Sequence, residues 1–155
     1  MTPAVTALQR AKISFTVHEY AHDPRAESWG LEAAQALNID PASVYKTLLA
    51  QIDGKELVVA IVPVNNTLNL KLLARAARAK RAEMANPDDA QRSTGYVLGG
   101  ISPVGQKKRL RTFVDDSVLA LSCVHVSGGR RGLEIELTPA NLIAATQATT
   151  AVIAA

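Results

Sequence analysis

The sequence has almost no cysteine and few aromatic residues, and both shortages narrow what the chain can be. Cys123 is the single cysteine among 155 residues, so an internal disulfide and a zinc site built from several cysteines are excluded. One unpaired thiol is typical of a reducing compartment. Aromatic residues make up only 4% of the chain, so its core must be built mainly from aliphatic side chains.

Long hydrophobic runs are also missing. The opening residues, MTPAVTALQRAK, lack the apolar stretch of a signal peptide, and no later run approaches membrane-spanning length. We therefore expect a soluble protein of the cytoplasm. Hydrophobic residues at 48% and charged residues at 20% are typical of one globular domain, which we expect to span residues 1–155.

The usual catalytic motifs are absent as well. The chain has no G-x-S-x-G elbow, no Walker loop and no dinucleotide fingerprint. His18 and His22 have no cysteine partners and no carboxylate at a spacing that suggests a third ligand, so the sequence predicts no bound metal. Cys123 lies among aliphatic residues. This setting favours a buried structural cysteine over a nucleophile, because no neighbour in the sequence would activate the thiol.

Hydrophobic periodicity predicts an α+β domain with a mixed, mostly antiparallel sheet flanked by helices, and the pattern also allows the sheet to close into a barrel. An Asp-Gly pair at 53–54 predicts a tight hairpin between two almost entirely apolar strands. The tail after the last helix has only a weak pattern. Helices are expected at 2–12, 30–38, 69–78, 86–93 and from 138, and strands at 13–20, 44–52, 57–62, 112–114, 123–126 and 133–137.

Lys46 and Thr47 interrupt one of these apolar strands. A lysine in such a strand must pair, carry its ammonium to the surface, or face a polar cavity. In a cavity the ammonium could hold a phosphate or a ribose hydroxyl, or stabilise an oxyanion that develops on an ester carbonyl. An edge-strand lysine with its ammonium in water explains the pattern equally well.

Two glycine-rich turns are the other candidates. The segment 99–105, GGISPVG, runs directly into a basic stretch, and the segment 126–134, VSGGRRGLE, carries two arginines at its tip. Paired glycines let a backbone approach a ligand closely, and basic residues attract phosphates. Ordinary turns explain both segments too, and the net charge of +3 does not by itself indicate nucleic acid. The candidate contacts to a polyanion are Lys107, Lys108, Arg109, Arg130 and Arg131.

In their order and spacing, the motifs resemble those of the YbaK-type deacylases, free-standing relatives of the editing domain inserted in bacterial prolyl-tRNA synthetases. The resemblance covers almost the whole chain and looks closest to the branch that acts on cysteinyl-tRNA(Pro). The motifs are GLEAA at 30–34, VYKTL at 44–48, STGY at 93–96, GGISPVG at 99–105 and VSGGRRGL at 126–133.

The resemblance implies a role for particular residues. The family's essential lysine corresponds to Lys46, and the backbone N–H groups of Gly99 and Gly100 would face the ester carbonyl oxygen. Trp29 stands where phenylalanine is usual in the family, and Glu134 where aspartate is usual. The implied substrate pocket is formed by Tyr20, Trp29, Thr47, Ser127 and Glu134.

The resemblance also implies a mechanism and partners. The thiol of a cysteinyl ester can attack its own carbonyl and release the tRNA as a cyclic thiolactone forms, so proximity replaces an enzymic nucleophile. No cofactor is implied. The expected partners are aminoacylated tRNA, namely Cys-tRNA(Pro) and Cys-tRNA(Cys), and prolyl-tRNA synthetase. Three alternatives stay open: a deacylase that uses water on another ester such as Ala-tRNA(Pro), a non-catalytic module that binds tRNA or a synthetase, and a generic nucleotide binder.

Overall fold

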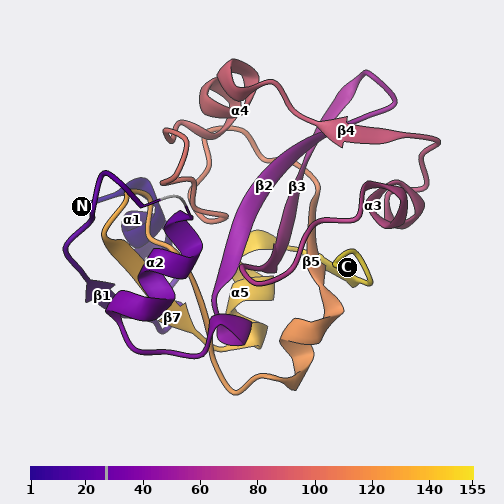
Figure 1. Cartoon of the computed structure of the whole chain (residues 1–155). Coiled ribbons are helices and arrows are strands. Elements are labelled where there is room, and N and C mark those ends of the chain that lie inside the picture. Colours follow the sequence, from indigo (N-terminus) through magenta and orange to yellow (C-terminus); the bar gives the residue numbers. More distant parts are fainter. Residues whose placement is uncertain (27) are drawn as a thin grey trace.

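The structure, a computed structural model that describes residues 1–26 and 28–155, is an α+β domain with two separate sheets (Figure 1). The helices are α1 (Pro3–Arg10), α2 (Trp29–Ala36), α3 (Leu70–Ala76), α4 (Pro87–Thr94) and α5 (Pro139–Thr146), with short 3-10 turns η1 (Pro41–Ser43) and η2 (Asp116–Ala120). The strands are β1 (Thr16–Glu19), β2 (Tyr45–Ile52), β3 (Glu56–Pro63), β4 (Ala82–Met84), β5 (Thr112–Asp115), β6 (Val124–Ser127), β7 (Leu133–Leu137) and β8 (Thr149–Ala151).

The sheets are mixed and mostly antiparallel, as predicted. One has the strand order β1-β7-β6 and the other the order β4-β2-β3-β5-β8. Only the pairs β3–β5 and β5–β8 are parallel. The barrel closure that the pattern allows does not occur, because β4 and β8, the edge strands of the larger sheet, do not pair with each other in the described residues. Within these residues the backbone bridge between the sheets is that of Val44 with His125, and side chains of both sheets pack into one core cluster.

The β2–β3 hairpin is the longest pairing in the chain and runs through the middle of the molecule (Figure 1). Asp53 and Gly54 both have positive φ angles, 51° and 67°, as the predicted tight turn requires. Val59 and Ile61 face one core cluster, whereas Val58, Ala60 and Val62 face the other. The central strand is therefore covered on both faces, which explains its continuous apolar sequence. None of the described helices is long and apolar enough to cross a membrane.

The helices begin where capping residues predict them. Each N-cap side chain accepts a backbone N–H from the first turn, and three helices place proline at their start. Sequence patterning missed the 3-10 turn η2 and two strands of three residues each, β4 and β8. Both lie at edges of the larger sheet, where so short a segment shows no clear alternation. The N-caps are Thr2, Ser28, Asn69, Asn86 and Thr138.

Asp115 fastens the C-terminal segment to the core. Its Oδ1 accepts the backbone N–H groups of Ile153 at 3.0 Å and Ala154 at 2.9 Å, and its Oδ2 accepts that of Ser117 at 3.2 Å. Burial alone would raise the pKa of this carboxyl, but the hydrogen bonds outweigh burial and hold the pKa below its ordinary value. Asp115 is only 5% exposed, so water cannot replace its carboxylate as the acceptor for these N–H groups.

Removal of this carboxylate should destabilise the fold. Asp115→Ala leaves the N–H groups of Ser117, Ile153 and Ala154 without this acceptor, and we expect the free energy of unfolding to fall by roughly 2–4 kcal/mol. The exposed neighbour Asp116 is the matched control, and Asp116→Ala should change stability by less than ~0.5 kcal/mol. Urea denaturation of both variants measures the difference. Equal losses would show that the carboxylate does not fasten the segment.

Candidate active site

A cavity of about 310 Å³ lies where the two sheets meet. Its walls come from α2, the first half of β2, the loop that contains the glycine pair, and the ends of β6 and β7. The volume is at the small end of the range for small-molecule sites in proteins. The lining residues are Tyr20, Ser28, Trp29, Gly30, Val44, Tyr45, Lys46, Thr47, Leu48, Leu98, Gly99, Ile101, Ser127, Arg130 and Glu134.

The structure brings most of the predicted site residues together around this cavity. Lys46, Gly99 and the whole implied substrate pocket line it, and Arg130 stands beside them. Gly100 is buried next to the lining, where an added Cβ would come within 2.9 Å of the Arg130 Cα. Leu98 and Ile101 also line the cavity. They were missed because an apolar residue beside a glycine pair looks like ordinary core.

The basic residues of the 107–109 segment do not join this site. Lys108 and Arg109 line a different hollow, against α1 and α5. The backbone N–H groups of Lys107 and Lys108 donate to the carbonyls of Thr94 and Ser93 at 2.9 Å, which holds the segment against the end of α4. The predicted basic contacts thus fall into two groups, and only the tip arginines are near the cavity.

Lys46 presents a cation to the cavity. The side chain is half-buried near the start of β2, opposite Val62 of β3. Burial lowers the pKa of its ammonium. Within residues 1–26 and 28–155, Lys46 forms no ion pair and its side chain forms no hydrogen bond. An ammonium in this state is available to an anionic or ester oxygen.

Glu134 is the most perturbed group in the cavity. It lies on β7 between two neighbours, with Ser127 of β6 and His18 of β1 directly opposite. The residue is only 6% exposed, and this burial raises the pKa of its carboxyl to about 8. At pH 7 this carboxyl is therefore mostly protonated and neutral.

Buried polar atoms without a partner concentrate at this site. In the described part of the chain, four buried side-chain nitrogen or oxygen atoms lack a hydrogen bond. Thr47 Oγ1 and Glu134 Oε2 belong to lining residues, and Arg131 Nε packs over the ring of Trp29. The fourth is His125 Nδ1. Because buried polar groups are normally satisfied, such a cluster indicates a place that water or a ligand fills.

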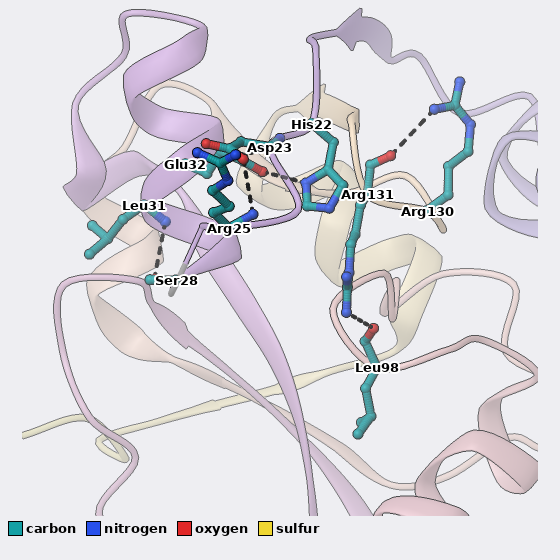
Figure 2. Close-up of polar contacts among 9 residues, drawn as sticks. All are labelled: His22, Asp23, Arg25, Ser28, Leu31, Glu32, Leu98, Arg130 and Arg131. Atoms are coloured by element: carbon teal, nitrogen blue, oxygen red, sulfur yellow. Dashed lines mark hydrogen bonds and ion pairs between the residues drawn. The ribbon is translucent and has the colours of Figure 1, made fainter.

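The Gly99 loop passes tightly under Arg131. The Arg131 Cζ lies 4.2 Å from the ring centroid of Trp29, and its Nη2 donates to the Leu98 carbonyl at 3.1 Å (Figure 2). Gly99 has φ +85°, and an added Cβ would overlap the Arg131 guanidinium and lie 2.8 Å from Trp29 Cδ2. Only glycine fits here.

The two glycines of this loop differ in their free donors. The Gly100 N–H donates to the Val97 carbonyl at 3.0 Å, which closes a turn. The Gly99 N–H has no acceptor in residues 1–26 and 28–155. Of the two N–H groups expected to face a ligand, only that of Gly99 is therefore free, because the Gly100 N–H is used within the turn.

The segment leading into α2 is fixed by one carboxylate. Glu32 pairs with His22 Nδ1 at 2.8 Å and accepts the backbone N–H of Asp23 at 2.8 Å (Figure 2). Ser28 Oγ accepts the Leu31 N–H and so starts α2 at Trp29, one residue earlier than predicted. His22 therefore has a structural role, and its pairing helps to place Trp29 at the cavity.

Comparison with known proteins decides the family. The sequence profile of the aminoacyl-tRNA editing domain matches residues 23–145. This chain belongs to the aminoacyl-tRNA editing domain family. The chain is 34% identical over 148 residues to EbsC of Enterococcus faecalis, a candidate Cys-tRNA(Pro)/Cys-tRNA(Cys) deacylase. The match covers 94% of this chain and 88% of that protein.

Other relatives place the editing domain within larger proteins. The chain is 33% identical over 100 residues to a proline–tRNA ligase of Oleidesulfovibrio alaskensis, and the match covers 64% of this chain but only 17% of the ligase. A crystal structure of a candidate trans-editing enzyme for prolyl-tRNA synthetase superposes with a TM-score of 0.84 at 24% identity, covering 100% of this chain and 99% of the other. At these values the structural match establishes the fold.

The buried Glu134 should make stability depend on pH. Between its ordinary pKa and about 8, the folded state holds a proton that the unfolded state has lost. Raising the pH through this window therefore favours unfolding. Glu134→Gln keeps a neutral side chain at every pH, so the variant should become more stable than the wild type as pH rises from 5 to 9, by a margin on the order of a few kcal/mol.

Urea denaturation at pH 5, 7 and 9 measures this margin. Glu56 on the exposed hairpin end serves as the control, because Arg111 lowers its pKa. Glu56→Gln should give no gain at high pH. A margin for Glu134→Gln that does not grow with pH would contradict the raised pKa.

Proposed function

We propose that this editing domain is a cytoplasmic trans-editing deacylase that clears cysteine from mischarged Cys-tRNA(Pro), and also acts on Cys-tRNA(Cys). The observation that carries the proposal is the composition of the cavity. Among the described residues its lining includes a lysine, a neutral carboxylic acid and a free backbone N–H, but no cysteine and no histidine. The hydroxyls of the lining thus lack the imidazole base that usually activates a nucleophile.

A cysteinyl ester supplies the missing nucleophile itself. Its sulfur attacks the carbonyl carbon, so that an S–C bond forms and the bond from that carbon to the ribose oxygen breaks. The thiol proton passes to the ribose oxygen, which leaves as the free hydroxyl of the tRNA. The cyclic thiolactone that remains then reacts with water to give cysteine. Neither step needs an oxidant, and the protein contributes orientation and charge stabilisation.

Each group in the cavity has a role in this scheme. Lys46 anchors the terminal ribose and stabilises the oxygen that gains negative charge. The Gly99 N–H donates to the carbonyl oxygen. Glu134 receives the substrate ammonium, and the arrival of this cation favours ionisation of the carboxyl. Tyr20, Trp29 and Ser127 shape the space for the side chain, so that the thiol lies close to its own carbonyl.

Selectivity then depends on chemistry more than on fit. Alanine and serine esters are as small as cysteine, and a pocket separates such side chains by only ~1–3 kcal/mol. Neither carries a thiol, so both lack the fast route. A proline ester also lacks it, and correctly charged Pro-tRNA(Pro) would be spared.

The surface around the cavity is suited to the rest of the tRNA. Arg130 lies at the cavity, where it would meet the phosphates next to the terminal adenosine. The 107–109 segment provides a second basic area, separate from the cavity, for the tRNA body. Because a domain of this size contacts little of a tRNA, prolyl-tRNA synthetase is the proposed source of tRNA selectivity.

The proposal is tested by deacylation of Cys-tRNA(Pro), Ser-tRNA(Pro) and Ala-tRNA(Pro). We expect rapid loss of cysteine only, since serine differs from cysteine by one atom and lacks the thiol. Lys46→Ala should slow cysteine release on the order of 10²-fold. Lys55→Ala, which removes an exposed lysine from the far end of the same hairpin, should leave the rate unchanged.

Other results would select a different function. Similar rates on all three esters would indicate a deacylase that uses water. Binding of tRNA without turnover on any ester would indicate a non-catalytic module. Full activity of Lys46→Ala would remove that residue from the mechanism.

The close packing at Gly99 predicts a selective loss of activity. Gly99→Ala should lower kcat/KM for Cys-tRNA(Pro) by roughly 10- to 100-fold, because the new methyl group displaces Arg131 and Trp29 from the cavity wall. Gly54→Ala is the matched control. Its φ is also positive, at +67°, but nothing lies within 4 Å of the added Cβ. Both glycines have φ in the left-handed region that favours glycine, so equal activity losses would contradict the steric argument.

A further inference from the structure

Two histidines and a carboxylate converge on the smaller sheet, on residues that the proposed reaction does not use. His18 Nε2 lies 2.7 Å from Glu136 Oε1, and His125 Nε2 lies 3.4 Å from the same oxygen. One potential ligand atom of each residue lies within 4.8 Å of those of the other two. The residues come from all three strands, β1, β6 and β7.

The sheet register holds this group in place. His125 and Glu136 are directly opposite in the β6–β7 pair, and His18 of β1 lies two residues further along β7, opposite Glu134. Alternate residues of a strand share a face, so Glu136 and Glu134 project from the same side of β7. The group is therefore a neighbour of the cavity, but it is made of different side chains.

The distances fit one metal ion. Two imidazoles and one carboxylate are the protein ligands of many zinc sites that keep a fourth position open. Ligand atoms bound tetrahedrally at the usual zinc distances lie about 3.3 Å from one another. The two separations from Glu136 Oε1, 2.7 Å and 3.4 Å, are close to this value. The imidazole nitrogens lie within 4.8 Å of each other, so they must move closer together to bind an ion.

Burial gives the site one fixed ligand and an entrance. His125 is only 4% exposed, so the strands hold its ring rigidly. The side chains of His18 and Glu136 are each 34% exposed, which leaves a path for an ion from solvent.

An ordinary ion pair does not account for the group. His22 and Glu32 form such a pair at 2.8 Å, and the Glu32 carboxylate also accepts a hydrogen bond from a backbone N–H. The His18–Glu136 pair has instead a second, buried imidazole aimed at the same oxygen. That imidazole leaves its Nδ1 without a partner in the described residues, so it is held by its position in the sheet and not by a complete hydrogen-bond network.

We infer that His18, His125 and Glu136 bind one divalent transition-metal ion, with Zn²⁺ the best match to this ligand set and the fourth position open to solvent. The site was invisible in the sequence, where His18 had only His22 nearby. Its ligands are separated by up to 118 positions. The inference stands apart from the deacylase proposal, in which no step uses a metal.

Calorimetric titration of the untagged full chain with ZnCl₂ at pH 7.5 tests the inference. We expect one ion per chain. His18→Gln and Glu136→Gln should each weaken binding at least ~10-fold, whereas His22→Gln and Glu32→Gln, from the ordinary ion pair, should leave it unchanged. Binding should weaken as the pH falls, because a metal ion and protons compete for the same ligand atoms.

Co²⁺ in place of Zn²⁺ reports on the ligands by absorption. We expect a visible cobalt spectrum in the wild type that is lost in His18→Gln and Glu136→Gln and kept in Cys123→Ser. The inference is overturned if the wild type takes up no stoichiometric ion, or if the His22 and His18 variants weaken binding equally. Cysteine release measured in chelator keeps the two proposals separate, since loss of metal binding should not slow it.

Discussion

The site depends on one short backbone contact between the two sheets, which also pack against each other through the side chains of a shared core. Val44 forms a bridge to His125 of the smaller sheet and, on its other side, accepts the Val64 N–H of the larger sheet at 2.8 Å. Lys46 follows two residues later on β2, while Ser127 and Glu134 stand on the other side of this seam. A main-chain contact of this kind fixes the groups from both sheets without using their side chains, which stay free to face a ligand.

The seam concentrates polar groups that a folded chain normally avoids. A buried carboxyl, a buried hydroxyl and a buried guanidinium nitrogen remain there without partners in the described residues, and each is unfavourable until something binds. The surrounding core offsets this cost. Val59, Ile61 and Ile135 are fully buried, and the Asp115 hydrogen bonds close the far end of the larger sheet. Stability and function are thus assigned to different parts of one small domain.

Much of the fold could be predicted because its signals are local. Capping residues and prolines place the helix starts, and the Asp53-Gly54 turn fixes the central hairpin. Lys46 could be singled out because a charged residue breaks an apolar strand. Barrel closure could not be predicted, since it depends on whether the two edge strands of the sheet pair with each other. Nor could the sequence predict that the Gly100 N–H is used within its own turn, because this depends on the conformation of the loop. The His18–His125–Glu136 group depends on register among three strands, which no spacing in the sequence reveals.

The stacking of Arg131 on Trp29 has a practical consequence. Trp29 is the only tryptophan in the chain, and it lies in the cavity wall with a cation 4.2 Å from its ring centroid. Its ultraviolet emission is therefore a built-in optical signal from this one place, free of any background from other indoles. Whatever enters the cavity, or shifts the arginine, changes the surroundings of the indole, so occupancy can be followed in real time without attaching a dye.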